Sequence, residues 1–262
     1  MKKIKTLFNT IRFFGIAHLI QRSIIKVFGI KIKDFSQVSK LFADKTGLEV
    51  GGPSGVFRDK GFIPIYKIIK ELDGCNFSGT TIWEGKLNSG ETYLFHPNKK
   101  KGTQYISEAS DLGSIPNEKY NFVISSNCLE HVANPMKAVK DWLRVLKLEG
   151  IILLILPNKK YCFDHKRPVT KFSHVLDDFN KNIGEDDLTH LDEILKLHDL
   201  RMDEAAGGFE QFKERSLKNF ENRALHQHIF DNNLLKEIFD FFKVETILQV
   251  ENREHIILGR KK

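Results

Sequence analysis

Apolar runs followed by turn residues predict buried parallel strands in the middle of the chain. The clearest runs cover residues 47–50, 121–125 and 151–156. Between the last two, apolar residues recur at helical spacing over residues 133–146, and Gly150 follows as a helix-terminating residue. The pattern predicts a β-α-β unit of a parallel sheet.

The last third of the chain has a different pattern. Residues 244–250 and 255–259 are apolar runs separated by a polar turn at 251–253, which predicts an antiparallel hairpin. The stretch before them, from Pro157 to about Phe230, is polar and rich in histidine, and it is too long for a simple connection. Helical spacing over residues 188–200 indicates helix within it. We interpret this stretch as an inserted lid or substrate subdomain on one large domain.

Composition predicts a folded protein of a reducing compartment. Of the 262 residues, 41% are hydrophobic and 29% are charged, as in ordinary globular proteins. The three cysteines, Cys75, Cys128 and Cys162, lack Cys-x-x-Cys spacing, so neither a disulfide framework nor a thiolate metal site is expected. No run approaches the roughly 20 apolar residues of a membrane-spanning helix, and no signal-peptide cleavage site is recognisable. We expect a cytoplasmic protein.

Positive charge is concentrated at the N-terminus. Residues 1–33 contain eight Lys and Arg residues and no Asp or Glu, whereas the whole chain has a formal charge of +7, so the remaining residues carry about one net negative charge. This balance argues against a nucleic-acid partner. Apolar residues at positions 4, 7, 8, 11 and 14 recur at helical spacing. The segment either packs on the domain or a second subunit, or makes peripheral contact with the inner face of an anionic membrane.

A glycine-rich loop follows the first predicted strand. Glu49, Gly51, Pro53 and Gly55 alternate with single intervening residues. An acidic residue at a strand end, followed by a glycine-rich turn that opens a helix, lets backbone amides approach a ligand. Taken alone, Gly-Gly-Pro is also compatible with a simple turn. The loop is therefore a candidate binding site, and the rest of the chain must decide between a binding loop and a simple turn.

Four segments together resemble the motifs of class I methyltransferases that depend on S-adenosyl-L-methionine (SAM). Residues 48–54 (LEVGGPS) resemble the first motif, acidic-x-Gly-x-Gly-x-Gly, and residues 105–112 resemble the adenine-contacting segment. Residues 120–132 resemble the fourth strand and its exit, and residues 137–157 continue the pattern. The resemblance covers about residues 46–160 and is to bacterial, methyltransferase type 11-like proteins of surface polysaccharide gene sets.

The resemblance implies an α/β fold: a Rossmann-like seven-stranded sheet with a C-terminal antiparallel hairpin and a large insertion before the last two strands. The expected segments are a basic amphipathic N-terminal helical segment (1–45), a SAM-binding core (46–160), a His-rich lid or substrate insertion (161–230), and a C-terminal helix and hairpin that complete the core (231–262). Two residues depart from the family pattern. Pro53 replaces the middle glycine and removes an amide donor, and Asn121 replaces the acidic residue that starts the fourth strand.

The resemblance also places the cofactor site. Glu49 and the loop amides would lie near the methionine part of SAM, and an acid of the second strand would bind the ribose hydroxyls. Asp73 is preferred because it lies 22 positions after Gly51, close to the expected spacing of about 20. Glu84 is the alternative, and a solvated surface charge is the other reading of either residue. The complete expected set is Glu49, Gly51, Gly52, Pro53, Ser54, Gly55, Asp73, Glu84, Glu108, Ala109, Ser126 and Asn127.

Histidines are the candidate catalytic bases, because imidazole accepts protons near neutral pH. His131 directly follows the fourth strand, which would place it at the cleft; the alternative is a structural histidine bonded to a main-chain carbonyl. In the insertion, His165 or His190 is a further candidate base, and Arg167 is a candidate clamp for a phosphate or carboxylate. Histidines and acids are dense there, but no spacing matches a metal motif, so we expect a solvated face and no metal.

We therefore expect an enzyme that O-methylates a small polar acceptor, such as a sugar or sugar-phosphate in surface polysaccharide assembly. The polar insertion, the nearly neutral body and the resemblance support this hypothesis. Two alternatives stay open. One is N-methylation or lipid head-group methylation at a membrane surface, and the other is a non-catalytic SAM-binding partner subunit, which Pro53 and Asn121 motivate.

Overall fold

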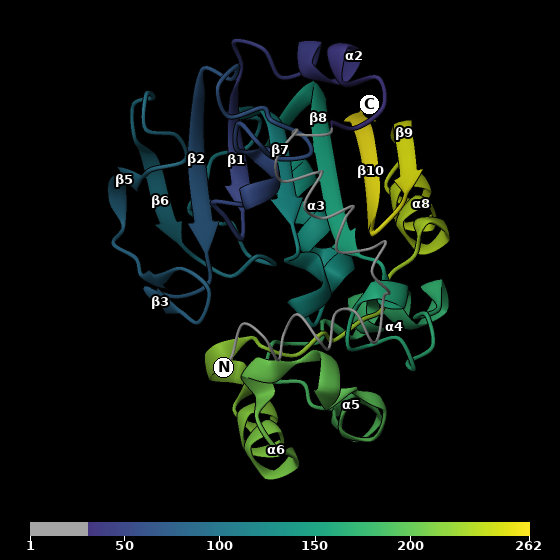
Figure 1. The fold of residues 1–262 in the computed structure, drawn as a ribbon. Helices are drawn as coiled ribbons and strands as arrows, with labels where there is room; N and C mark the ends of the chain where they lie inside the picture. The colour runs from purple at the N-terminus through teal and green to yellow at the C-terminus, as the bar shows by residue number, and fades with distance from the viewer. Residues whose placement is uncertain (1–30) are drawn as a thin grey trace.

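A mixed sheet of eight strands forms the centre of the molecule (Figure 1). The structure is a computed structural model, and it describes residues 31–262. The strands follow the order β5-β6-β2-β1-β7-β8-β10-β9 across the sheet. Their bounds are β1 Thr46–Val50, β2 Glu71–Asn76, β5 Gly90–Tyr93, β6 Gly102–Ile106, β7 Tyr120–Ser126, β8 Leu146–Pro157, β9 Val244–Glu251 and β10 Glu254–Lys261.

The strand directions confirm the expected α/β fold. Strands β6, β2, β1, β7 and β8 are parallel, whereas β10 pairs antiparallel with both β8 and β9. Every apolar run predicted as a strand lies in one, and the C-terminal hairpin is present. Strand β5 adds an antiparallel edge strand beyond the seven that the resemblance implied.

Helices cover one face of this sheet. They are α3 Pro135–Val145, α4 Phe172–Lys181 and α8 Asn232–Phe241. Helix α3, the predicted crossover, begins where the side chain of Asn134 accepts a hydrogen bond from the Lys137 amide and Pro135 fixes the first φ angle. Its apolar side, including the fully buried Trp142, packs in one core with α4, α8 and the sheet.

The opposite face is covered mainly by a long loop between β1 and β2. Phe57, Ile63, Tyr66 and Ile69 of this loop are fully buried and pack with the sheet and with α2 (Phe35–Lys40). The glycine-rich turn was expected to open a helix, and this was wrong. A single 3-10 turn (Gly55–Phe57) follows it, and the loop continues through turns and bends.

Strand β8 shows how the sequence buries the sheet on both faces. Ile152, Leu154 and Leu156 belong to the core beneath the helices. The alternate residues, Ile151, Leu153 and Ile155, belong to the core beneath the loop. Successive side chains of a strand point to opposite faces, so a continuous apolar run fills both cores at once.

Between β8 and α8 the chain forms the insertion, a group of helices of which α5 and α6 lie beyond the carboxyl ends of the parallel strands (Figure 1). It contains α4, α5 Leu191–Leu197, α6 Phe209–Leu217 and α7 Asn219–Asn222. A small apolar cluster of its own, which includes Ile194, Phe212 and Leu225, holds α5 and α6 together. Helix α5 lies within the stretch that helical spacing had indicated.

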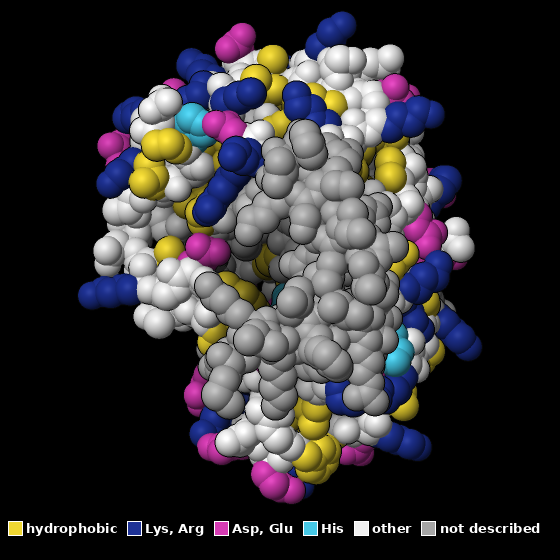
Figure 2. All heavy atoms as spheres, viewed as in Figure 1, with side chains coloured by type: hydrophobic (Ala, Val, Ile, Leu, Met, Phe, Trp, Pro, Cys, Tyr) yellow, Lys and Arg dark blue, Asp and Glu magenta, His cyan; other side chains and the backbone are white. Residues whose placement is uncertain are grey.

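Of the basic amphipathic helical segment expected over residues 1–45, residues 1–30 lie outside the described residues, and the described part contains the short helix α2. Among residues 31–262, no helix is long and apolar enough to cross a membrane. On the face shown in Figure 2, the described basic and acidic side chains are interspersed. This distribution agrees with the small net charge of the chain after residue 33.

Candidate active site

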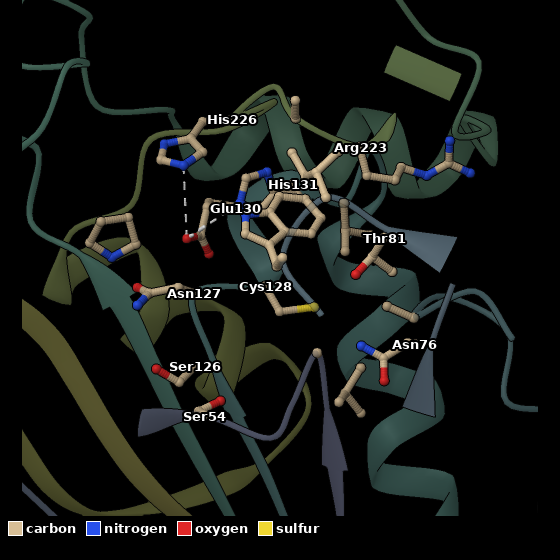
Figure 3. A pocket seen from close by; sticks show the side chains of 18 of the residues that line it. Ser54, Asn76, Thr81, Ser126, Asn127, Cys128, Glu130, His131, Arg223 and His226 are labelled. Atoms are coloured by element: carbon tan, nitrogen blue, oxygen red, sulfur yellow. Dashed lines mark ion pairs between the residues drawn. The ribbon is translucent and has the colours of Figure 1, made fainter. Parts of the chain in front are cut away.

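A cavity of about 660 Å³ lies at the carboxyl edge of the parallel strands, between the sheet and the insertion (Figure 3). Each parallel strand contributes to it at or just after its end: Val50, Asn76, Ser107, Ser126 and Pro157. Open α/β sheets bind ligands at this edge. The volume lies within the range of about 300–1,000 Å³ that small-molecule sites occupy.

The glycine-rich loop forms one wall of the cavity. Its residues Gly51, Pro53, Ser54 and Gly55 line the wall, whereas Gly52 does not. Gly51 has a φ of 83°, a left-handed conformation that favours glycine, and a Cβ there would lie 2.7 Å from the Cβ of Cys128. The loop therefore reaches its position only with glycine at this point.

Glu49 supports the loop from beneath and is not among the residues that line the cavity. Its buried carboxylate accepts hydrogen bonds from the hydroxyls of Tyr66 and Tyr93, both at 2.6 Å, and from the Ser54 amide at 2.9 Å. Burial raises the pKa of Glu49, and these hydrogen bonds oppose that rise. The expected contact of Glu49 with the cofactor is replaced by a role in holding the loop.

The acid expected to bind ribose is also displaced. Asp73 lies within β2, where it accepts hydrogen bonds from the Thr103 amide at 2.8 Å, Lys119 Nζ at 2.9 Å and the Tyr120 hydroxyl at 2.7 Å, and it does not line the cavity. The last residue of β2 is Asn76, which does line it. Counting from Gly51 missed Asn76 because the long loop after β1 delays the start of β2.

The other expected cofactor residues lie at the cavity. Glu84 reaches it from a short hairpin, β3 (Thr80–Thr81) and β4 (Gly85–Lys86), while Ser126 and Asn127 reach it from the end of β7. Residues Glu108 and Ala109 follow β6 and also line the cavity. Glu108 accepts a hydrogen bond from Arg223 Nη2 at 2.6 Å, which ties the sheet edge to the insertion.

His131 lines the cavity, as its position after β7 indicated. Its Nδ1 lies 3.0 Å from the carbonyl oxygen of Leu225, and because a carbonyl only accepts, Nδ1 carries the proton. The lone pair is then on Nε2. Burial and the neighbouring His226 lower the pKa of His131 to about 3, so the ring is neutral at physiological pH.

His165, Arg167 and His190 lie outside the cavity, which corrects their expected roles. His165 Nε2 lies 3.0 Å from Asp199 Oδ2, and His190 Nε2 lies 3.1 Å from the Nε2 of His174. The guanidinium of Arg167 is buried and cannot clamp a substrate anion, because protein groups already occupy it. Its partners are Asp164, Glu193 and the carbonyl oxygens of His226 and Gln227.

Two cavity residues that the sequence analysis did not select, Glu130 and His226, converge on His131 (Figure 3). Glu130 Oε1 lies 4.0 Å from the Nε2 atoms of both His131 and His226. Among the described residues, neither oxygen of this buried carboxyl has a hydrogen-bond partner. Burial raises the pKa of Glu130 to about 7. Glu130 adjoins His131 in sequence, but nothing in the sequence links either residue to position 226.

The buried carboxylate of Asp164 orients His226. Nδ1 of His226 lies 2.5 Å from Oδ2 of Asp164, so that Nε2 of His226 faces Glu130 and the cavity. Burial would lower the pKa of His226, but the charge and hydrogen bond of Asp164 outweigh burial and raise it. Arg167 in turn holds Asp164 and the backbone at His226. An imidazole held by a carboxylate in this way is arranged to exchange a proton at its other nitrogen.

The comparison that decides the family is a match of residues 23–223 to the family described as "Methyltransferase domain". The chain belongs to this family. This methyltransferase uses SAM as its methyl donor, as the family implies. No curated protein matches the chain.

Solved structures with a similar fold share little sequence with this methyltransferase. A SAM-dependent methyltransferase from Aquifex aeolicus is 13% identical, with 87% of this chain and 90% of that chain covered and a TM-score of 0.45. A possible histamine N-methyltransferase from Thermotoga maritima is 15% identical, with 97% and 99% covered and a TM-score of 0.43. At these values the neighbours carry no argument about the acceptor.

The residues at the cavity fit SAM. A Cβ added at Gly55 would meet no atom within 4 Å, so the loop leaves space above it. Hydroxyl, amide and carboxylate side chains surround that space, from Ser54, Asn76, Glu108 and Asn127. These groups match the polar ribose, adenine and amino-acid parts of the cofactor. Pro53 has no amide N–H to donate, but other donors lie beside it in the wall.

Proposed function

We propose that this methyltransferase methylates a hydroxyl group of a small polar acceptor, of which a sugar is our leading candidate. The observation that carries the proposal is the group of Glu130, His131 and His226 at the cavity (Figure 3). When bound, SAM supplies a methyl group on a positively charged sulfonium, a good leaving group. What remains for the chain is to hold the cofactor, align the acceptor and take its proton.

The loop and the strand ends would hold the cofactor. Gly51, Ser54 and Gly55 would lie against its amino-acid part, Asn76 against the ribose, and Glu108 with Ala109 against the adenine. This assignment follows the order of the strand ends around the cavity. It also moves the ribose contact from Asp73 to Asn76, since Asn76 lines the cavity and Asp73 does not; Glu84, the alternative acid, lines the cavity as well.

His226 would accept the proton of the acceptor hydroxyl at Nε2. Asp164 holds Nδ1–H and makes the ring a stronger base than a free imidazole, while Glu130 Oε1, at 4.0 Å from Nε2, offers a second place for the proton. Arg167, expected from the sequence to hold the substrate, would act as a positioning residue behind the Asp164–His226 pair.

The charges around the cavity favour a neutral acceptor over a phosphorylated one. Arg223 is paired with Glu108 at 2.6 Å, and Arg215 is paired with Asp203 at 2.9 Å. The expected phosphate clamp, Arg167, is buried elsewhere. Trp83, half exposed at the cavity with its ring centroid 5.0 Å from that of His131, offers an apolar surface of the kind that packs against a sugar ring.

A second candidate function is N-methylation of an amine. Glu130 and Glu254 both line the cavity, and among the described residues the Glu254 Oε2 atom and both Glu130 oxygens lack hydrogen-bond partners. Buried carboxyl groups without hydrogen-bond partners would favour binding of an acceptor that carries a cationic amine. Methylation of a lipid head group depends on residues 1–33, most of which lie outside the described part.

Single-turnover methyl transfer to a panel of sugars and amines tests these proposals. We expect His226→Ala to slow transfer by about 10²–10⁴-fold, the usual contribution of a general base, without weakening SAM binding measured by calorimetry. His165→Ala is the matched control, because His165 is also paired with an aspartate of the insertion but lies outside the cavity.

An unchanged rate for His226→Ala would show that His226 is not the general base. Transfer only to amines would replace the hydroxyl acceptor with the second candidate. Failure of both SAM and its demethylated product to bind below millimolar concentration would instead favour a non-catalytic subunit.

A further inference from the structure

A second group of histidines lies in the insertion, outside the cavity. It consists of His174 and Asp178 on α4, His190 just before α5, and His228 in the extended segment before α8. One ligand atom from each of the four side chains lies within 4.8 Å of the others. Because the four residues come from three separate parts of the chain, folding of the insertion brings them together.

The distances between these atoms resemble the edges of a small tetrahedron. The two Nε2 atoms of His174 and His190 are 3.1 Å apart. Asp178 Oδ2 lies 3.3 Å from His174 Nε2 and 3.7 Å from His228 Nε2. Nitrogen and oxygen ligands about 2.0–2.1 Å from a tetrahedral zinc ion are separated by about 3.3 Å.

The orientation of the three imidazole rings agrees with this arrangement. Their centroids are 4.9 Å apart for His174 and His190, 5.1 Å for His190 and His228, and 5.7 Å for His174 and His228. The interplanar angles lie between 60° and 80°, so the rings do not stack.

An unpartnered polar atom is the second, independent observation. Within the described part, Asp178 Oδ2 is buried and makes no hydrogen bond. Asp178 is 8% exposed, and the neighbouring His228 is 1% exposed. Buried acceptors normally have partners, so a ligand atom left without one is a position where an ion could bind.

We propose that His174, Asp178, His190 and His228 bind one divalent metal ion of the zinc class. Three imidazoles and one carboxylate are donors that zinc accepts, and four ligands complete its tetrahedral coordination. His228 Nε2 now donates to the carbonyl oxygen of Ala133 at 3.0 Å, so binding through this atom exchanges that bond for the metal and moves the proton to Nδ1. His174 is half exposed, which gives the ion a path from solvent.

The other group of possible ligands, Glu130, His131 and His226, fits a metal less well. Its carboxylate lies 4.0 Å from each Nε2, farther than an edge of the zinc tetrahedron. The metal site is therefore assigned to the insertion and not to the cavity.

The metal would act on the active site through the backbone. His228 lies two residues after His226, and the Gln227 amide between them donates to the Glu130 carbonyl oxygen at 2.7 Å. A metal that links this segment to α4 and to the start of α5 would fix the backbone from which His226 enters the cavity. We expect a structural site whose loss loosens the insertion.

Calorimetry of the tag-free full chain, freed of metal by a chelator, tests the proposal with Zn²⁺ alone. We expect one equivalent to bind with a dissociation constant below micromolar. Co²⁺ in its place is expected to give the visible absorption of a four-coordinate ion. His174→Gln and His190→Gln should each weaken Zn²⁺ binding on the order of 100-fold, because each removes one of four ligands. His165→Gln, at a histidine of the insertion outside the group, should leave it unchanged.

The result that overturns the site is absence of stoichiometric Zn²⁺ binding, or binding that the two ligand variants leave intact. Circular dichroism shows whether the variants fold, and His174 is the safer position because its side chain is 41% exposed. If both variants unfold, the chelator-treated natural chain still decides, because Zn²⁺ must raise its melting temperature if the site exists.

Discussion

At the scale of single residues, the support of the cofactor loop lies one layer below the cavity. Glu49 belongs to the motif that identified the loop, yet its partners are Tyr66, Tyr93 and the Ser54 amide. A buried carboxylate with three hydrogen-bond donors holds the loop rigidly. Removing one donor leaves the buried carboxylate only partly hydrogen-bonded, which is costly at low dielectric. The binding wall therefore depends on residues that do not touch the ligand.

Tyr66→Phe tests this anchor. The change removes the donor to Glu49 and the hydroxyl that accepts the Ser54 amide at 2.8 Å. We expect a loss of about 1–3 kcal/mol in the free energy of unfolding, the usual cost of leaving a buried polar group unpaired, together with weaker SAM binding. Urea denaturation and calorimetry measure the two effects. Tyr105→Phe, whose partly exposed hydroxyl accepts from Lys119 and is not bonded to Glu49, is the control, and an equal effect there would contradict the anchor.

Glu130 gives the site a dependence on pH. Burial raises its pKa to about 7, so the carboxyl is neutral below that pH and ionised above it. If the ionised form helps His226 take the proton, the single-turnover rate rises as pH passes through about 7 and then levels. Glu130→Gln should lower the rate and abolish this rise. A rise that persists in the variant would assign it to another group.

Residue chemistry was only partly predictable from the sequence. Glu108, Ser126, Asn127 and His131 lie at the cavity because strand ends are recognisable and parallel strands end at one edge. His226 could not be predicted, because the sequence does not show where the folded insertion places this residue relative to Glu130. Arg167 was interpreted as a clamp because a sequence cannot show which arginines fold into ion pairs.

At the scale of elements, the insertion is held by ion pairs as much as by its small apolar cluster. Asp203 accepts from Arg215 Nη2 of α6 at 2.9 Å and lies 3.2 Å from Nε2 of His198, which follows α5. Burial opposes ionisation of Asp203, but hydrogen bonds from His198 and Arg215 outweigh it and lower its pKa to about 2. This carboxylate adds an ionic link between the end of α5 and α6, beside the apolar cluster that the two helices share.

Stability of the insertion should therefore fall in acid. The folded-state pKa of Asp203 is below its ordinary value of 3.8, so its contribution is complete above that value and is lost as pH falls towards about 2. We expect Asp203→Asn to cost about 2 kcal/mol at neutral pH and to reduce the acid sensitivity. Chemical denaturation between pH 2 and pH 7 measures both, and equal slopes for the two proteins would contradict the assignment.

The elements themselves were predictable where they repeat a period. Strand β8 and helix α3 were recognised because both cores demand apolar residues at fixed spacing. The loop after β1 was not, because Phe57, Ile63, Tyr66 and Ile69 belong to no α-helix or strand and are buried by tertiary contacts. Edge strand β5 is short and largely exposed, so its pattern is too weak to recognise.

At the scale of the whole molecule, the cavity lies between the sheet and the insertion, which also contact each other through pairs such as Arg223 with Glu108. A ligand held between sheet and insertion should stabilise both. At 100 times its dissociation constant, SAM should add about 2.7 kcal/mol to the free energy of unfolding, equivalent to a rise of roughly 5–10 °C in melting temperature. Differential scanning fluorimetry measures the shift. No shift at saturating SAM would mean that the cavity does not bind it.

The insertion enters the chain after β8 and returns before α8, and β8 pairs directly with β10, the last strand of the chain. Replacing residues 158–230 would thus leave every hydrogen bond between neighbouring strands intact. If the insertion selects the acceptor, grafting another insertion onto the same sheet should change the acceptor while the sheet is kept.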